Sequence, residues 1–110
     1  MGMLRRMCLL QGSSHLGMSF YNNLRVAASH GEIDKIRRLV QRGADVCVQG
    51  CHGKTALHFG ALMGQTEMVK VLVQLGADVG AKDNDASTPL HGAALNGYIE
   101  TVKALVQLGA

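Results

Sequence analysis

The tripeptide Gly53-Lys54-Thr55 matches the end of a phosphate-binding P-loop. A complete P-loop also needs a glycine five residues before Gly53 and a buried strand ahead of it, because its backbone N–H groups surround the phosphates. Val48 stands at that place instead. We therefore expect Lys54 and Thr55 to be a loop residue and a helix N-cap, and we expect no nucleotide site.

Cysteine and histidine gather between residues 47 and 58. Cys47 and Cys51 are separated by three residues, where a haem-attachment motif has two, and His52 and His58 follow them. A structural zinc site needs four converging ligands, which this spacing does not provide. The pattern predicts no metal and no other cofactor, although Cys51 at an exposed turn remains a candidate reactive thiol.

No set of residues suggests catalysis. The chain has neither a pair of carboxylates at a defined site nor a nucleophile elbow, and it has no Ser/His/Asp set in a predicted pocket. Short helices with loops on one side also leave no deep cleft for a small-molecule substrate. We expect a protein that is not an enzyme.

Charge and length narrow the class of protein further. The 110 residues suffice for one domain, and the net charge of +3 is uneven, with eight Lys or Arg and three acids in residues 1–55. No run is apolar enough to span a membrane, and residues 1–20 lack a secretory signal, so we expect an intracellular protein, cytoplasmic or nuclear. We interpret residues 1–20 as a loose leader, with a mitochondrial presequence as the alternative.

A repeat of 33 residues organises the rest of the chain. The string Thr55-Ala56-Leu57-His58 returns as Thr88-Pro89-Leu90-His91. The same step links Leu24, Leu57 and Leu90; Gly31, Gly64 and Gly97; Leu39, Leu72 and Leu105; Gly43, Gly76 and Gly109; and Ala44, Ala77 and Ala110. Five independent sets at one spacing indicate a true internal repeat.

Each copy predicts two short helices. In the third copy Thr88 is a natural N-cap and Pro89 suits the first helical position, so a helix is expected from Pro89 to about Asn96, and a second from Ile99 to about Leu108. The second copy gives helices over 56–63 and 66–75. Helices of two to three turns are unstable alone, so they must pack as antiparallel pairs that stack on one another.

These residues carry a resemblance to a known family. The strings Thr88-Pro89-Leu90-His91-Gly92-Ala93-Ala94 and Gly76-Ala77-Asp78-Val79 are similar to the ankyrin repeat signature. The resemblance implies an all-α solenoid of stacked antiparallel helix pairs joined by β-turn loops, with repeats at about 21–48, 49–81 and 82–110. It also implies that His58 bonds to a neighbouring loop.

Departures from the pattern give three further expectations. The basic residues of the first repeat, among them Lys35 and Arg42, suit a terminal repeat that turns a polar face to water. At the other end nothing polar covers Ala104, Leu105 and Leu108, so we expect the protein to continue into further repeats or another domain. Ala86 stands where the first turn has Gly53, so the second turn should differ or be strained, since alanine tolerates positive φ poorly.

The resemblance implies that partners bind the loop tips and the exposed side of the inner helices. After framework positions are removed, the candidate partner-binding residues are Gln49, Cys51, His52, Lys54, Leu62, Met63, Lys82, Asn84, Asp85, Ser87, Leu95 and Asn96. Leu62, Met63 and Leu95 matter most because they are apolar, although they could instead be partly buried against the next repeat. Phe59 is expected in the core.

We therefore predict a non-enzymatic module that binds a partner protein. The alternative is a spacer segment of a longer solenoid with no partner of its own. A third hypothesis, nucleic-acid binding by Arg25, Arg37, Arg38 and Arg42, is less favoured, because no dense cationic face with aromatic platforms is visible.

Overall fold

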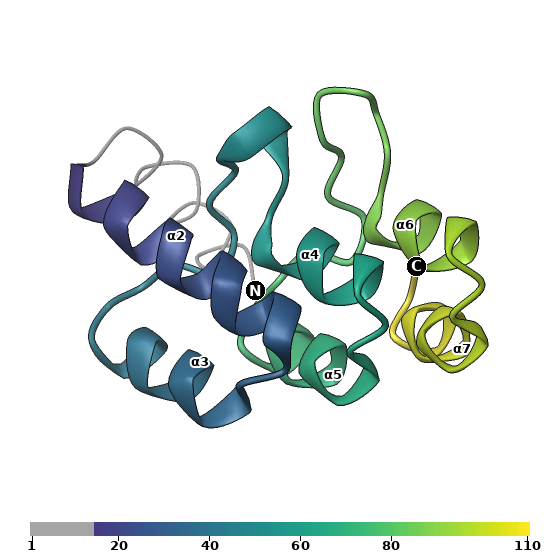
Figure 1. Ribbon diagram of the computed structural model, residues 1–110, viewed down its shortest axis with the longest axis horizontal. Coiled ribbons are helices and arrows are strands. Elements are labelled where there is room, and N and C mark those ends of the chain that lie inside the picture. Colours follow the sequence, from purple (N-terminus) through teal and green to yellow (C-terminus); the bar gives the residue numbers. More distant parts are fainter. Residues whose placement is uncertain (1–14) are drawn as a thin grey trace.

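The computed structural model describes residues 15–110, and the regular secondary structure in that range consists of helices, without strands (Figure 1). The α-helices are α2 (His15–His30), α3 (Ile33–Gln41), α4 (Ala56–Leu62), α5 (Thr66–Gln74), α6 (Pro89–Leu95) and α7 (Ile99–Gln107), and a 3-10 turn, η1, spans Cys51–Gly53. The four helices predicted between residues 56 and 108 all form, and each ends one residue earlier than expected. The predicted all-α solenoid is confirmed.

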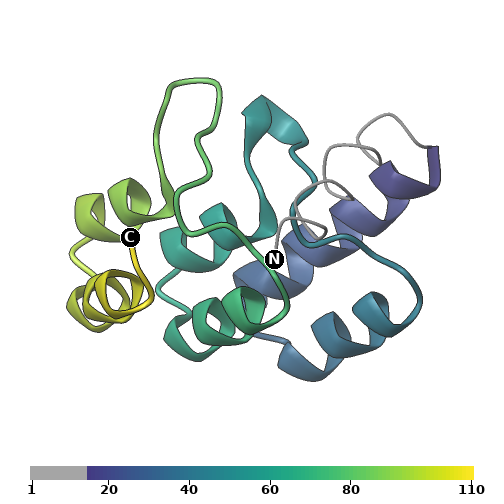
Figure 2. The same ribbon diagram turned by 180° about the vertical axis from the view of Figure 1, so that it is seen from behind.

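The helices form three antiparallel pairs that stack side by side. Helices α2, α4 and α6 lie next to one another in one layer, and we call them the inner helices (Figures 1 and 2). Helices α3, α5 and α7 form the second layer, and we call them the outer helices. Two long loops, one before α4 and one before α6, rise from the same side of the stack. This arrangement places the loops beside the inner helices, where the sequence predicted the binding surface.

The first helix starts earlier than the predicted start of the repeat domain. Helix α2 begins at His15, whereas the sequence suggested a loose leader up to residue 20. Residues 15–20 therefore belong to the first helix pair. The remainder of the predicted leader, residues 1–14, lies outside the described residues.

The core is built from equivalent positions of the repeats. Leu24 and Leu57 are 1% and 0% exposed, and Leu72 and Leu105 are both fully buried. Leu90, the third member of the first set, packs against the same core but is only half-buried. The 33-residue period of the sequence is thus a period of packing, and Leu90 differs because no helix pair lies beyond α6 and α7 in the described residues.

The outer side of the last pair is open, but at other residues than expected. Ala104 and Leu105 are 4% and 0% exposed, because they face the core, and the expectation that they lie uncovered is wrong. Leu108 also packs partly against the core. The uncovered apolar side chains are instead Ile99 and Val106, which are 66% and 54% exposed.

Phe59 is not a core residue, which corrects the expectation from its framework position. Its ring is half-buried, and the Arg25 guanidinium lies 5.7 Å from the ring centroid. A cation over an aromatic face at this distance is attracted by the ring electrons. Phe59 therefore lies on the inner-helix surface, under Arg25.

Both loop turns adopt a left-handed backbone at the same repeat position, which confirms the expected strain. Gly53 has φ 75° and Ala86 has φ 61°. A Cβ atom makes this region unfavourable by about 1–2 kcal/mol. The second turn therefore keeps the left-handed residue and accepts its strain, but it is not a copy of the first turn, in which His52 is also left-handed, with φ 55°.

Replacing Ala86 with glycine should therefore stabilise the protein by about 1 kcal/mol, because the released strain exceeds the entropy gained by the unfolded chain. Urea denaturation of both proteins measures the difference. The reciprocal Gly53→Ala change should destabilise, since a Cβ there would also lie 2.9 Å from the backbone nitrogen of Asn84. A destabilising Ala86→Gly change would show that the turn is not strained.

Candidate partner-binding groove

A hollow of about 230 Å³ lies between the second and third repeats. We call it the inter-repeat groove. It is lined by the ends of the two loops and by the facing sides of α4 and α6: Lys54, His58, Leu62, Asp83, Ser87, Thr88, His91, Gly92 and Leu95. Polar residues therefore occupy the loop end of the groove, and leucines occupy the helix end.

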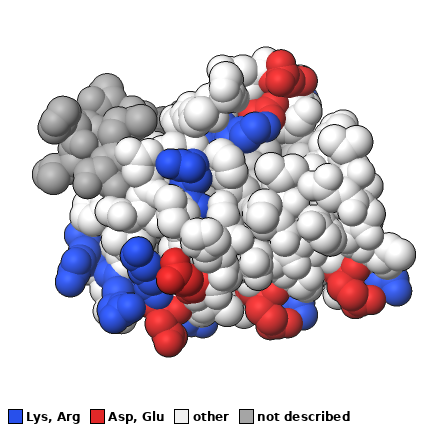
Figure 3. Space-filling view, viewed as in Figure 1, with Lys and Arg blue, Asp and Glu red and all other residues white. Residues whose placement is uncertain are grey.

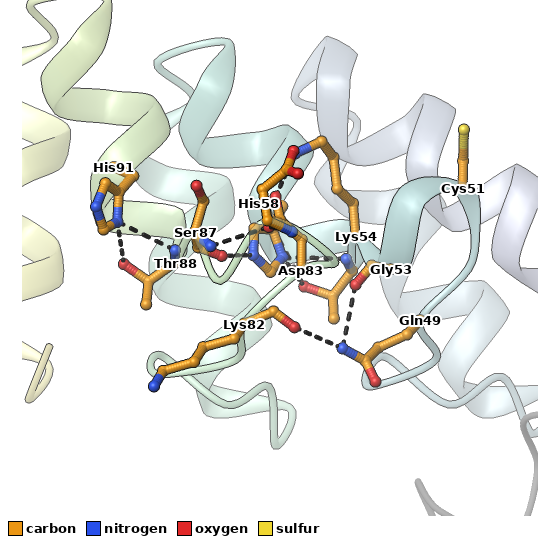
Figure 4. A network of polar contacts seen from close by, with 12 residues as sticks. Gln49, Cys51, Gly53, Lys54, His58, Lys82, Asp83, Ser87, Thr88 and His91 are labelled. Carbon is orange, nitrogen blue, oxygen red and sulfur yellow. Dashed lines mark hydrogen bonds and ion pairs between the residues drawn. The ribbon is translucent and has the colours of Figure 1, made fainter.

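An ion pair between Lys54 and Asp83 joins the two loops at the polar end (Figure 4). The Asp83 side chain is 1% exposed, and its Oδ1 accepts the backbone N–H groups of Asp85 and Ser87, each at 2.9 Å. The hydrogen bond from Lys54, followed by that from the Ser87 backbone, holds the pKa of Asp83 well below its usual range. Asp83 is therefore an anion at neutral pH that shapes the loop before α6 and fixes Lys54 beside it.

His58 joins the second helix pair to the loop before α6. Its Nδ1 accepts the N–H of Thr55 at 3.1 Å, and its Nε2 lies 2.9 Å from the carbonyl oxygen of Ser87. Because a carbonyl only accepts, Nε2 carries the proton, and the ring is the neutral Nε2–H tautomer. Burial lowers the pKa of His58, which keeps the ring neutral. The hydrogen bond to a neighbouring loop implied for this histidine is confirmed.

His91 repeats half of this arrangement. Its Nδ1 accepts the N–H of Thr88 at 3.2 Å, so it caps α6 as His58 caps α4. Its side chain is exposed, and within residues 15–110 its Nε2 has no hydrogen-bond partner. The third repeat thus presents a donor where the second makes a bond across repeats.

The structure brings four of the predicted binding residues into the groove: Lys54, Leu62, Ser87 and Leu95. The others lie elsewhere on the loops and the inner helices: Gln49, Cys51, His52, Met63, Lys82, Asn84, Asp85 and Asn96. These eight are all exposed. Figure 4 shows the Cys51 thiol, which is free, pointing away from the polar network.

Two of the predicted residues also hold the scaffold together. Gln49 Nε2 donates to the carbonyl oxygens of Gly53 at 3.1 Å and Lys82 at 2.8 Å, which ties neighbouring loops. Asn96 Nδ2 donates to the carbonyl oxygen of Leu62 at 2.9 Å, which ties neighbouring inner helices. Both amide groups already make hydrogen bonds between repeats, so a contact with a partner would break bonds that stabilise the stack.

The three apolar candidates differ in exposure. Leu95 is 84% exposed and Met63 is 49% exposed. Leu62 is half-buried, and a Cβ atom added to Gly92 would lie 3.4 Å from its Cδ1, so Leu62 packs against the next repeat. The groove therefore has a fixed leucine on one wall and a leucine on the other that projects into solvent.

Sequence reasoning missed five residues of the groove: His58, Asp83, Thr88, His91 and Gly92. The histidines, Thr88 and Gly92 were set aside as framework, yet they remain accessible from the groove. Asp83 had a signal that was not used. It places a charge where the previous repeat has Gly50.

The basic residues do not form one surface. Lys and Arg gather over α3 (Figure 3), where Arg37, Arg38 and Arg42 are exposed. Arg25 lies instead on α2, over the Phe59 ring of the inner layer. The four arginines of the nucleic-acid hypothesis thus split between the two layers.

Two other kinds of feature are missing from the described residues. Between residues 15 and 110 no three His, Cys, Asp or Glu side chains are grouped so as to hold a metal ion. None of the helices in that range is both long and apolar enough to cross a bilayer.

Comparison with known proteins agrees with the geometry. The family model for ankyrin repeats matches residues 24–110 as three copies. No curated protein matches the chain with significance. The match covers most of the sequence and the same three helix pairs that the structure contains, and we conclude that the chain belongs to the ankyrin repeat family.

Proposed function

We propose that this protein is a non-enzymatic interaction module that binds a partner protein through the inter-repeat groove and the neighbouring loop tips. Ankyrin repeats generally mediate interactions between proteins. The observation that carries the groove assignment is the 84% exposure of Leu95 beside the half-buried Leu62. A large apolar side chain held in water on a rigid helix, with polar neighbours around it, is typical of a binding anchor.

The groove supports binding because its parts are already fixed. The Lys54–Asp83 ion pair and the His58–Ser87 hydrogen bond join the second repeat to the loop before α6. A partner therefore need not order these elements when it binds, which lowers the entropic cost of association. An apolar side chain of the partner would fit between Leu62 and Leu95, with polar contacts at the loop end.

The loop tips supply the outer part of the proposed surface. His52, Asn84 and Asp85 are exposed on the two long loops, beyond the groove. Side chains at such positions set specificity more than affinity, because they remain solvated at the rim.

We propose that the protein acts inside the cell.

A matched pair of variants tests the proposal. Met63→Asp combined with Leu95→Asp places charge on the exposed anchors, and Leu62 is left in place because it packs against Gly92. Gln74→Asp combined with Gln107→Asp makes the same charge change on exposed positions of the outer helices. Each protein is immobilised, and proteins retained from an extract of its own organism are quantified, with excess soluble wild-type chain to identify saturable binding.

The Met63/Leu95 variant should lose at least about tenfold of the saturable capture, as expected when one apolar anchor in the groove and one on the neighbouring surface of α4 are removed. The outer-helix variant should capture as the wild type does, and circular dichroism should show that both variants are folded. Equal capture by the two variants would refute the groove. A wild-type chain with no saturable partner would support the alternative, a spacer segment of a longer solenoid.

A further inference from the structure

The inner helices carry no acidic residue. The sequences of α2, α4 and α6 contain Arg25 and several histidines, but neither Asp nor Glu. The acidic residues that lie within helices, Asp34, Glu67 and Glu100, all belong to the outer helices. Figure 3 shows the acidic side chains in the lower part of the molecule and at the tip of a loop. The inner helices therefore contribute no negative charge to their own exposed side.

Arg25 is the charged residue of these helices, and it takes the place of a histidine. The 33-residue step equates it with His58 and His91, which cap their own helices. The Arg25 guanidinium lies instead over the Phe59 ring of the next inner helix, 5.7 Å from its centroid. Among residues 15–110 no carboxylate lies within ion-pair distance of Arg25. Its charge is therefore available to an anion from outside the chain.

Apolar side chains continue from Arg25 across all three inner helices. Val26 of α2 is 37% exposed, and Phe59, at the same repeat position on α4, is half-buried. Leu62 and Leu95, which also share a repeat position, line the groove between α4 and α6. We call the surface formed by Arg25 and these four apolar residues the inner-helix face.

A partner that covers the inner-helix face must also cover Arg25. Because the guanidinium lies over Phe59, a segment cannot contact the apolar side chains of α2 and α4 without removing water from the charge. Burial of an unpaired charge is strongly unfavourable, whereas a carboxylate can form two parallel hydrogen bonds with a guanidinium. A neutral or basic segment would leave the covered guanidinium unpaired, and an acidic segment would not.

The loop end of the groove also presents hydrogen-bond donors. Nε2 of His91 is a donor, and the Lys54 ammonium has three N–H groups on a side chain that is 30% exposed. Asp83 beside it is only 1% exposed, so its carboxylate offers little to a partner in the groove. A segment that crosses the inner helices thus meets donors at both ends of the apolar residues, with Arg25 at the α2 end.

We propose that the partner presents an acidic and apolar segment to the inner-helix face, with an Asp or Glu carboxylate on Arg25 and apolar side chains along the face as far as the groove. The inference rests on the proposed function, because it names the kind of segment that the groove and its surroundings bind. The absence of acids from the inner helices favours the same partner, since an acidic segment meets no helical carboxylate on this face.

A random peptide library displayed on phage tests the kind of segment directly. Peptides of about 12 residues are long enough to cross the face, since packed helices lie about 8–10 Å apart and an extended residue spans about 3.3 Å. Selection on the immobilised chain should enrich peptides in which Asp or Glu lies close to large apolar residues. The Met63→Asp/Leu95→Asp variant should lose these peptides.

The pairing with Arg25 is then measured on one selected peptide by fluorescence anisotropy. Arg25→Gln should weaken binding by at least about tenfold, as expected when one partner of a covered charge pair is removed. Replacing the acidic residue of the peptide with its amide should weaken binding to the wild type similarly, and should have little further effect on Arg25→Gln. Arg38→Gln makes the same charge change on exposed α3 and should leave binding unchanged. Thermal denaturation should show that both variants are folded.

The outcomes separate this inference from the proposed function. Selected peptides without acidic residues, or acidic peptides that bind Arg25→Gln as tightly as the wild type, would overturn the acidic segment. The groove would still stand if the Met63/Leu95 variant lost those peptides. A library that yields no saturable peptide would contradict both proposals. Single-stranded DNA that binds the wild type but not Arg25→Gln, with no peptide selected, would assign the face to nucleic acid instead.

Discussion

Replacing Leu57 with alanine should lower the free energy of unfolding by about 3 kcal/mol, because it leaves a cavity that close-packed neighbours fill poorly. Leu57 is 0% exposed, in the middle of the three helix pairs. It belongs to a buried cluster that includes residues of all three pairs. Urea denaturation, with the m-value compared between variants, measures the change.

Leu90→Ala is the matched control for this prediction. Leu90 occupies the same repeat position on α6 but is only half-buried, so its truncation should cost about 1 kcal/mol. The ratio between the two losses reports the position of each pair in the stack, since the chemical change is identical. Equal losses would contradict the view that the third pair is the open end of the array.

The sequence predicted the helices well because their ends depend on local signals. Thr55 and Thr88 cap α4 and α6, as expected from their types, and glycines follow the ends of the second helices. The core followed from the 33-residue spacing, since equivalent positions of a stacked repeat meet equivalent neighbours. Both the helix ends and the core positions can therefore be predicted from the sequence of one repeat and its copies.

The start of α2 could not be predicted in the same way. The first repeat lacks the Thr-x-Leu-His string of the later two, so no cap signal marks where its inner helix begins. The structure places the beginning at His15, within a stretch that composition suggested was a leader. A missing local signal thus produced an error of several residues.

The roles of the variable residues were also beyond the sequence. Gln49 and Asn96 vary between repeats and look free, but each donates to a backbone carbonyl of the neighbouring repeat. Lys54 and Asp83 form their ion pair across the same boundary. Such pairs depend on how two repeats are placed side by side, which comparison of aligned copies does not show.

Among the glycines that follow the inner helices, Gly64 is the one whose replacement by alanine should destabilise the protein most. Gly64 has φ 70°, and an added Cβ would lie 2.8–3.0 Å from three carbon atoms of the Tyr98 ring in the next repeat. The left-handed conformation alone costs about 1 kcal/mol. Displacement of Tyr98 adds about 1–3 kcal/mol, as overpacking does elsewhere. Thermal and urea denaturation should show a total loss of about 2–4 kcal/mol.

Gly97→Ala separates these two contributions. Gly97 has φ 72°, almost the same as Gly64, but no atom lies within 4 Å of the position that a Cβ would take. It should therefore cost only the conformational part, about 1 kcal/mol. Tyr98→Ala should reduce the penalty of Gly64→Ala, because the clash disappears with the ring. If Gly64→Ala and Gly97→Ala cost the same, contact with Tyr98 contributes nothing, and close packing between the second and third repeats is not what requires glycine at Gly64.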